Sequence, residues 1–165
     1  FKVFTTGGSI DKFYSTQTSE FEIGDPQIHA ILDQANVAVD YEIEPLIKKD
    51  SLQLTDRDRD EIHDMVKSDP HRRILITHGT DTMIDTALAL LDIPGKVIVI
   101  TGAMQPAAFR ETDAHFNIGS AVIALQTLPE GVYVVMNGRV FDPRLSKKNQ
   151  QMDRFEELSG VVKHD

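Results

Sequence analysis

Short apolar runs alternate along the chain with longer segments in which apolar side chains recur every three or four residues. The runs have the length of buried strands, and the recurring pattern is typical of amphipathic helices. Continuous apolar strands that alternate with helices indicate a mainly parallel sheet covered by helices on both faces. We therefore expect a single α/β domain of the flavodoxin or Rossmann type over residues 1–165. The expected strands are residues 2–6, 37–43, 73–77, 97–101 and 132–136, and the expected helices are residues 25–35, 55–66, 81–91 and 112–125.

Three segments are less regular than this pattern, and one of the expected helices has a clear start. Residues 37–43 alternate between apolar and polar side chains, which predicts a half-buried strand near a sheet edge. Asp25 and Pro26 are a typical helix start, because Asp accepts hydrogen bonds from free amides and Pro fits the first turn. Residues 7–24 show no clean period and predict a polar loop. The tail from Arg139 predicts a hairpin followed by a linker.

Polar residues follow three of the expected strands. Gly7-Gly8-Ser9 follows the first strand, Thr77 to Asp81 follows the second apolar run, and Thr101 to Met104 follows the third. In an open parallel sheet, ligands bind outside the carboxyl ends of the strands. We expect these loops to open into one crevice that offers two hydroxyls and a carboxylate. Lys96, beside the strand 97–101, adds an amine, and together these groups can attack a carbonyl and move protons around it.

Composition narrows the classes of function. The chain has 165 residues, a net charge of −9 and no cysteine. Nucleic acids and anionic membranes bind basic surfaces, so neither is an expected partner. Without cysteine there is no disulfide and no thiolate nucleophile, and the six histidines lack metal-ligand spacing, so no metal or other cofactor is expected. No apolar run approaches the roughly 20 residues of a membrane span, and we expect a cytoplasmic protein.

Each candidate residue also has a structural interpretation. Gly7-Gly8 could form only a tight turn, since the third glycine of the dinucleotide fingerprint is absent. Thr80 and Asp81 are both common at the start of a helix. A lysine at a strand start, such as Lys96, usually lies in solvent. His78 could act as a general base, but its place in a tight turn favours a structural role.

Taken together, these segments resemble the bacterial L-asparaginases of the Thr-Gly-Gly-Thr-Ile type. The order and spacing of the similar segments extend over nearly all of the chain, and the seven-residue run from Thr77 is very specific. The resemblance rests on Thr6-Gly7-Gly8-Ser9-Ile10, Asp50-Ser51 with Leu54-Thr55, Thr77-His78-Gly79-Thr80-Asp81-Thr82-Met83, Lys96, Gly102-Ala103-Met104-Gln105-Pro106, Asp113, Phe116-Asn117, and residues 134–137 and 142–155.

The resemblance implies an amidohydrolase that converts L-asparagine and water into L-aspartate and ammonia through a covalent acyl-enzyme. Ser9 occupies the position of the first nucleophile, and Tyr14 that of a tyrosine on the mobile loop that contacts it. Thr80, Asp81 and Lys96 match the second catalytic group, in which Lys96 bridges the other two. An amide is a poor electrophile, so such a hydroxyl needs an activating partner.

The same resemblance implies a set of substrate-binding residues. Ser51 is expected to hold the α-carboxylate of asparagine, and Asp81 its α-ammonium group. Backbone amides near Thr80 and Ala103 are expected to bind the oxyanion, where fixed donors stabilise the tetrahedral intermediate. Gly8 and Gly79 complete the expected binding residues.

The chain departs from the family pattern at three points. Ser9 stands where the family usually has threonine, either as a natural variant or as an engineered substitution. Leu52 follows Ser51 where the longer secreted enzymes often have glutamine. The usual second domain does not follow residue 165, so we expect a short single-domain enzyme, with a fragment as the alternative.

Two other functions remain open at this stage. One is a small-molecule or amino-acid binding domain without turnover, and the other is an amidase subunit that acts on a larger substrate, such as glutamine attached to transfer RNA. We also expect a homo-oligomer, a dimer or tetramer, because an open crevice would admit water. Val140, Phe141 and Leu145 are candidates for the contact between subunits.

Overall fold

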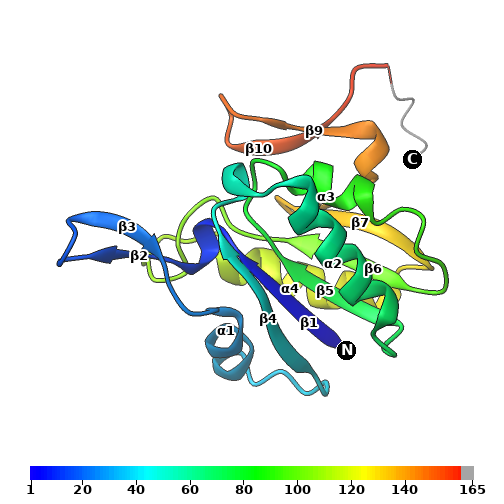
Figure 1. The fold of residues 1–165 in the computed structure, drawn as a ribbon, viewed down its shortest axis with the longest axis horizontal. Coiled ribbons are helices and arrows are strands. Elements are labelled where there is room, and N and C mark those ends of the chain that lie inside the picture. Colours follow the sequence, from blue (N-terminus) through cyan, green and yellow to red (C-terminus); the bar gives the residue numbers. More distant parts are fainter. Residues whose placement is uncertain (161–165) are drawn as a thin grey trace.

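A six-stranded sheet forms the centre of the structure, a computed structural model that describes residues 1–160 (Figure 1). Its strand order is β4-β1-β5-β6-β7-β8, in which β8 runs antiparallel at one edge and the others are parallel. The strands are β1 (Lys2–Gly7), β4 (Glu42–Lys49), β5 (Arg73–Thr77), β6 (Val97–Thr101), β7 (Gly131–Met136) and β8 (Arg139–Phe141).

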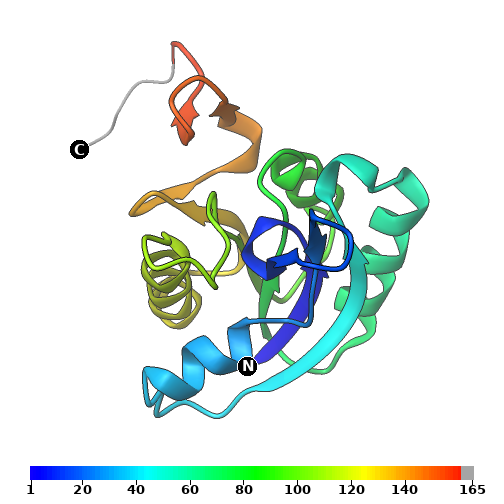
Figure 2. The ribbon, with the colours of Figure 1, turned by 90° about the vertical axis from the view of Figure 1, so that its left-hand side faces the viewer.

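Helices cover both faces of this sheet, as the sequence predicts (Figure 2). α1 (Ile28–Gln34) and α4 (Ala114–Thr127) lie on one face, and α2 (Asp56–Ser68) and α3 (Met83–Ala89) lie on the other. Successive strand residues supply the two cores: Val3 packs with α1 and α4, and Phe4 packs with α2 and α3. The expected α/β fold with a mainly parallel sheet is therefore confirmed. None of the described helices is long and apolar enough to cross a membrane.

The strand order contains a reversal that positions a binding site. The chain moves from β1 outward to β4 and then returns to β5 on the other side of β1. The loops after β1 and β5 therefore leave the sheet in opposite directions, which is the position where open α/β sheets have a ligand-binding crevice, at the carboxyl ends of the strands.

Helix α2 starts where the sequence predicts. The Thr55 hydroxyl accepts a hydrogen bond from the Asp58 amide at 3.3 Å, and the Asp58 carboxylate accepts one from the Thr55 amide at 2.8 Å. Lys49, at the end of β4, donates to the same carboxylate at 2.8 Å and holds the pKa of Asp58 down to about 2. This ion pair fixes the end of β4 to the start of α2.

Two expected elements differ from the structure. The strand expected at residues 37–43 lies at Glu42–Lys49, because the alternating residues before it wrap around the end of α1, where Val37 packs onto the core as a partly buried side chain. β4 contains Pro45, and because β4 is an edge strand the missing amide is tolerated. Helix α1 begins at Ile28 rather than at Asp25, and its free Gln27 amide donates to the Asp11 carboxylate.

The segment 7–24, expected as a loop, contains regular structure. A short 3-10 turn (Ser9–Asp11) is followed by the hairpin of β2 (Lys12–Ser15) and β3 (Glu20–Ile23), which projects from the body of the molecule (Figure 1). Its residues are mostly exposed, and the alternation of Phe21 and Ile23 with two glutamates in β3 is too short to predict a strand.

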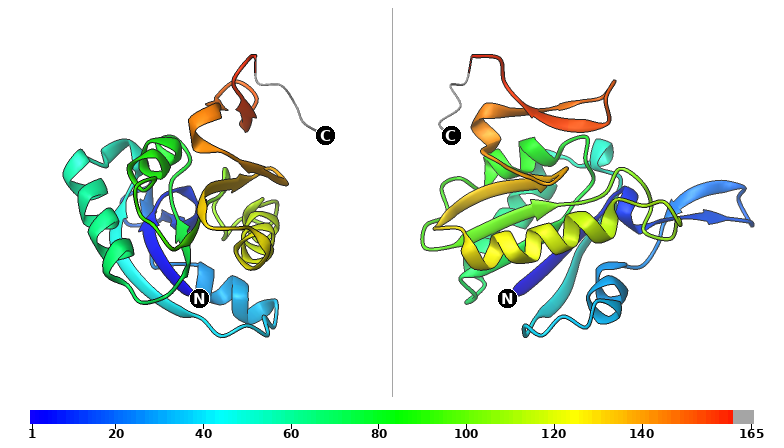
Figure 3. Two further views of the ribbon diagram at one scale, coloured as in Figure 1. Left: turned by 90° about the vertical axis from the view of Figure 1, so that its right-hand side faces the viewer. Right: turned by 180° about the vertical axis from the view of Figure 1, so that it is seen from behind.

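The expected hairpin in the tail is confirmed. A 3-10 turn (Pro143–Leu145) leads into β9 (Ser146–Asn149), which pairs with β10 (Arg154–Glu157). This β9–β10 hairpin runs above α3, which β9 contacts, and is seen from behind in the right-hand view of Figure 3. Lys148 of β9 donates to the Thr80 hydroxyl, so the hairpin borders the crevice that the strand order predicts.

Candidate active site

The turn after β1 is pressed against the turn after β5. Gly8 has a φ of 89°, and a Cβ atom there would collide with the backbone of Gly79. Only glycine meets both demands, a left-handed conformation and a close approach of two chains. Ser9 is therefore held at the edge of the turn that carries Thr80.

Ser51 closes the next side of the same site. It is 2% exposed, and a Cβ at Gly79 would lie 2.6 Å from its hydroxyl oxygen. The Thr82 hydroxyl donates to the Ser51 carbonyl at 2.8 Å and fixes this turn to the start of α3. The expected residues Gly8, Ser51 and Gly79 are thus brought together.

The loop after β6 forms a third wall. A side chain at Gly102 would collide with the His78 carbonyl, so the two loops are in direct contact. Asn117, in α4, donates to the Gly102 carbonyl at 3.0 Å and to the Asp113 carboxylate at 2.8 Å. The same carboxylate accepts the amide of Met104 at 3.0 Å. Ala103, 1% exposed, lies within this braced loop.

A lysine bridges Thr80 and Asp81. Nζ of Lys148, on β9, donates to the Thr80 hydroxyl oxygen at 2.8 Å and to an Asp81 carboxylate oxygen at 2.6 Å. Thr80 is 5% exposed, and the Lys148 side chain is 13% exposed. The structure therefore contains a hydroxyl, an amine and a carboxylate in one hydrogen-bonded row.

The prediction that Lys96 makes this bridge is wrong. Lys96 precedes β6 and so lies at the amino end of the sheet, opposite the crevice. Its Nζ donates to the carbonyl oxygens of Asp69 at 2.5 Å and His71 at 2.7 Å. The lysine is 8% exposed and acts as a brace between two loops.

Tyr14 is expected to contact Ser9, but no hydrogen bond joins the two side chains within residues 1–160. It lies on β2 in the projecting hairpin, 53% exposed, with its ring 5.6 Å from that of Phe21 in an edge-on arrangement. Phe21 in turn lies 5.9 Å from Phe109, in the loop after β6. These three rings connect the hairpin to the third wall of the crevice.

His78 is a buried structural residue. Its Nδ1 donates to the Gly79 carbonyl at 2.6 Å, which leaves Nε2 to accept from the Thr86 hydroxyl at 2.8 Å. Complete burial lowers the pKa of the imidazole to about 4, so the ring is neutral near pH 7. The ring shapes the turn before Thr80, as the sequence analysis favours.

A second ion pair borders the site. Partial burial acts to raise the pKa of Asp50, but the Lys12 ammonium at 2.7 Å and the Leu52 amide outweigh it, and the positive charge of Lys148 adds to them. The pKa of Asp50 is therefore below its ordinary value. Among residues 1–160 no group of three His, Cys, Asp or Glu side chains could hold a metal ion.

Fold and site together define the class of the protein: a flavodoxin-like α/β domain whose crevice gathers serine, threonine, aspartate and lysine. The family profile described as "Asparaginase, N-terminal" matches residues 1–159. The chain therefore belongs to the asparaginase family and corresponds to its N-terminal domain.

Three relatives illustrate the similarity. L-asparaginase 2 of Escherichia coli is 40% identical over 85 residues, which are 48% of this chain and 24% of that protein. The glutaminase-asparaginase of Acinetobacter glutaminasificans is 40% identical over 90 residues, 51% of this chain and 27% of that one. The solved thermostable L-asparaginase from Thermococcus kodakarensis superposes with a TM-score of 0.83 at 24% identity, over 94% of this chain and 50% of that chain. The chain thus spans about half the length of the solved relative.

Proposed function

We propose that the protein is an L-asparaginase, an amidohydrolase that releases ammonia from free L-asparagine. The observation that supports this most strongly is the row of Thr80, Lys148 and Asp81 beside the turn that carries Ser9. A site that only bound an amino acid would have no need of an amine on a hydroxyl oxygen.

In this proposal the two hydroxyls take different parts of the reaction. The Ser9 oxygen attacks the side-chain amide carbon of asparagine, and the Ser9 proton passes to the amide nitrogen, so that the C–N bond breaks and ammonia leaves. Water then attacks the ester carbon, its proton returns to the Ser9 oxygen, and the ester bond breaks to release aspartate. The Lys148 ammonium donates to the Thr80 oxygen and to the Asp81 carboxylate, which keeps its charge. Thr80 relays a proton from the attacking water to the departing Ser9 oxygen, or inherits the role of nucleophile.

The remaining contacts orient the substrate. Ser51 would receive the α-carboxylate and Asp81 the α-ammonium group, both from the floor of the crevice. Backbone amides near Thr80 and Ala103 would hold the oxyanion, and the hydrogen bond from Asn117 to the adjacent Gly102 carbonyl gives such donors a fixed direction. Tyr14 would contribute after the β2–β3 hairpin moves toward the crevice.

The experiment is an ammonia-release assay with asparagine and with glutamine, on the wild type and three variants. Ser9→Ala is expected to lose nearly all turnover, and Lys148→Met about a hundredfold or more, in line with the loss of a group that assists proton transfer. Lys147→Met is the matched control, because the neighbouring Lys147 pairs with Glu156 at 3.3 Å and is half-exposed.

Four outcomes would contradict all or part of the proposal. Full turnover in Lys148→Met would show that the lysine takes no part in the reaction. Full turnover in Ser9→Ala would show that Thr80, not Ser9, is the nucleophile. Aspartate that binds without any ammonia release from asparagine would favour the binding domain instead. Activity restricted to glutaminyl-tRNA would favour the amidase of larger substrates. Location in the cytoplasm stays a prediction, which cell fractionation tests.

A further inference from the structure

Asp11 lies at a junction of three segments. It ends the turn that begins with Ser9, and its amide donates to the Gly8 carbonyl at 3.1 Å. Its carbonyl accepts the amide of Gly24 at 2.7 Å, the first pair below the base of the β2–β3 hairpin. Its carboxylate accepts the amide of Gln27 at 2.8 Å, just before α1.

The segments that meet at Asp11 are packed too tightly to move independently. A Cβ at Gly24 would lie 2.9 Å from the Phe13 ring and 3.2 Å from the Asp11 carbonyl, so the two ends of the hairpin are packed tightly. The Ile10 carbonyl also accepts the amide of Ala107 at 3.0 Å, which ties the turn to the loop after β6. A movement of the hairpin therefore changes the hydrogen bonds and the packing of Asp11.

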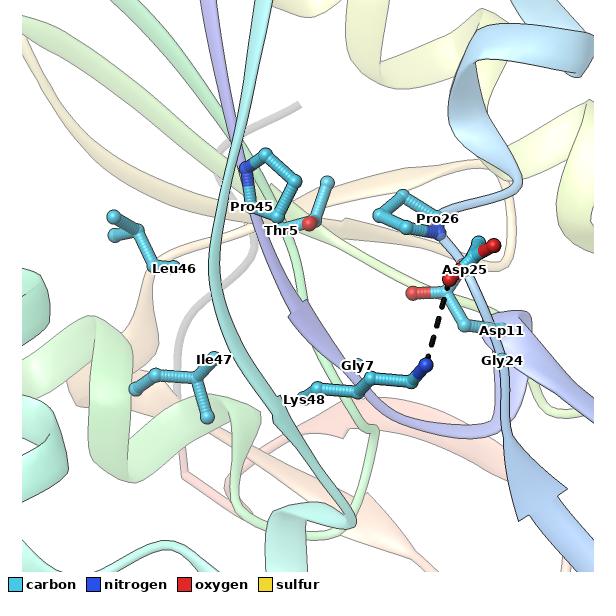
Figure 4. Close-up of a pocket in the computed structure, with 10 residues that line it drawn as sticks. All are labelled: Thr5, Gly7, Asp11, Gly24, Asp25, Pro26, Pro45, Leu46, Ile47 and Lys48. Carbon is cyan, nitrogen blue, oxygen red and sulfur yellow. Dashed lines mark hydrogen bonds and ion pairs between the residues drawn. The ribbon is translucent and has the colours of Figure 1, made fainter.

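The carboxyl group is buried beside a pocket. Asp11 is 3% exposed and lines a cavity of about 200 Å³ with Thr5, Asp25 and Lys48 (Figure 4). The charged groups that face it are Lys48 from β4, Asp25 from the segment before α1, and Lys12 from β2 in the adjoining pocket. Lys48 reaches Asp25 at 3.4 Å and Lys12 reaches Asp50 at 2.7 Å, so both cations already have partners.

We propose that Asp11 is a positioning residue that holds the Ser9 turn and the β2–β3 hairpin in register, and that its charge sets how readily this junction opens. The positioning of Ser9 rests on the proposed function, whereas the opening of the junction does not. Asp11 acts through its neighbours and does not touch the substrate.

Burial makes the junction sensitive to pH. Desolvation raises the pKa of Asp11 from 3.8 to about 7, against the opposing effects of the Gln27 amide and the Lys48 charge. In an open junction the carboxyl is solvated and keeps its ordinary value. Since the closed form holds the proton more tightly, a rise in pH from about 4 to about 7 favours opening, by up to roughly tenfold per pH unit.

The test is hydrogen exchange of residues 12–27 between pH 5 and pH 8, corrected for the intrinsic rate, in the wild type, Asp11→Asn and Asp11→Ala. The wild type should open more readily as pH rises toward 7. Asp11→Asn keeps an acceptor for Gln27 but cannot ionise, so its opening should not vary with pH. Asp11→Ala loses the acceptor and should exchange fast at every pH.

The kinetic counterpart uses the same variants. Asp11→Asn should lose the inflection near pH 7 in the kcat profile, and Asp11→Ala should lower kcat about tenfold with little change in KM. The proposal is overturned if Asp11→Asn keeps the exchange profile of the wild type, or if Asp11→Ala leaves the Gln27 amide protected. A wild type without ammonia release would contradict the proposed function only. The hydrogen-exchange measurement would still test the role of Asp11.

Discussion

At the scale of single residues, Lys96 contributes to stability rather than to chemistry. Its ammonium satisfies two carbonyls of the loop before β5, those of Asp69 and His71, in a largely buried setting. Lys2 lies close by, with its Nζ 2.7 Å from Glu44 and 3.8 Å from Asp69. The hydrogen bond to Glu44 raises the pKa of Lys2 despite the opposing effect of burial.

Lys96→Met is therefore expected to leave two acceptors unpaired and to lower the free energy of unfolding by about 1–3 kcal/mol. Turnover by the remaining folded protein should be unchanged, since the crevice lies at the other end of β6. Thermal unfolding and an ammonia assay on the same preparation measure the two quantities. A variant with the melting temperature of the wild type but without turnover would show that Lys96 takes part in the reaction.

The sequence could have excluded Lys96 without a structure. A residue before a parallel strand lies at its amino end, whereas the candidate hydroxyls follow their strands and lie at the carboxyl ends. Lys148 was harder to find, because it is separated from Thr80 by 68 positions and lies in a polar tail next to another lysine. Only the pairing of β9 with β10 turns one of these lysines toward the crevice and the other toward Glu156.

At the scale of elements, the β9–β10 hairpin depends on one buried apolar side chain. Phe155 is 3% exposed and lies 6.1 Å from the ring of Phe141, which is itself buried. The Phe155 amide donates to the Asn137 side-chain oxygen at 2.8 Å. Asn137 occupies the turn between β7 and β8 with a φ of 55°, a conformation that Gly, Asn and Asp tolerate.

Asn137→Gly should keep the turn and lose the acceptor, so the hairpin loosens and Lys148 departs from Thr80. We expect kcat to fall about tenfold, because small errors in position are costly in catalysis, while KM changes little. Asn137→Asp retains the acceptor and serves as the control with near wild-type kcat. Equal kinetics in all three proteins would show that the hairpin holds Lys148 without this bond.

The elements differ in how well the sequence predicts them. β5, β6 and β7 are buried on both faces, so their apolar runs coincide with their bounds. The β2–β3 hairpin is held by backbone pairing and by Asp11 rather than by a core, and β4 is an edge strand with Pro45 within it. The backbone pairs of the hairpin leave no pattern of apolar side chains, and β4 is stabilised by pairing with β1, which is distant in the sequence.

At the scale of the whole molecule, the expectation of a homo-oligomer stays a prediction with changed contact residues. Phe141 is 1% exposed and belongs to the core, so it is excluded from a subunit contact, whereas Val140 and Leu145 are 44% and 42% exposed. Two apolar side chains of α4 are more exposed than Val140 and Leu145: Phe116 is 63% exposed and Ile123 is 61% exposed.

We expect a dimer or tetramer in sedimentation velocity, and we expect Ile123→Glu to shift it toward the monomer, since burial of a new charge in an interface is costly. Ile123 borders a groove of about 430 Å³ between α1 and α4. Val140→Glu on the neighbouring edge strand tests the alternative contact. A wild type that sediments as a monomer with full activity would refute the assembly.

The distance in sequence between Thr80 and Lys148 has a consequence for biosynthesis. The crevice loops after β1, β5 and β6 all emerge from the ribosome before the amine does, and Phe155, which anchors the hairpin, emerges later still. A nascent chain halted after β8 would already hold its sheet and its hydroxyls, yet it would lack the lysine. On the proposed mechanism, nascent chains arrested between β8 and β9 would therefore fold without hydrolysing asparagine, and activity would begin only after β9 and β10 have been synthesised.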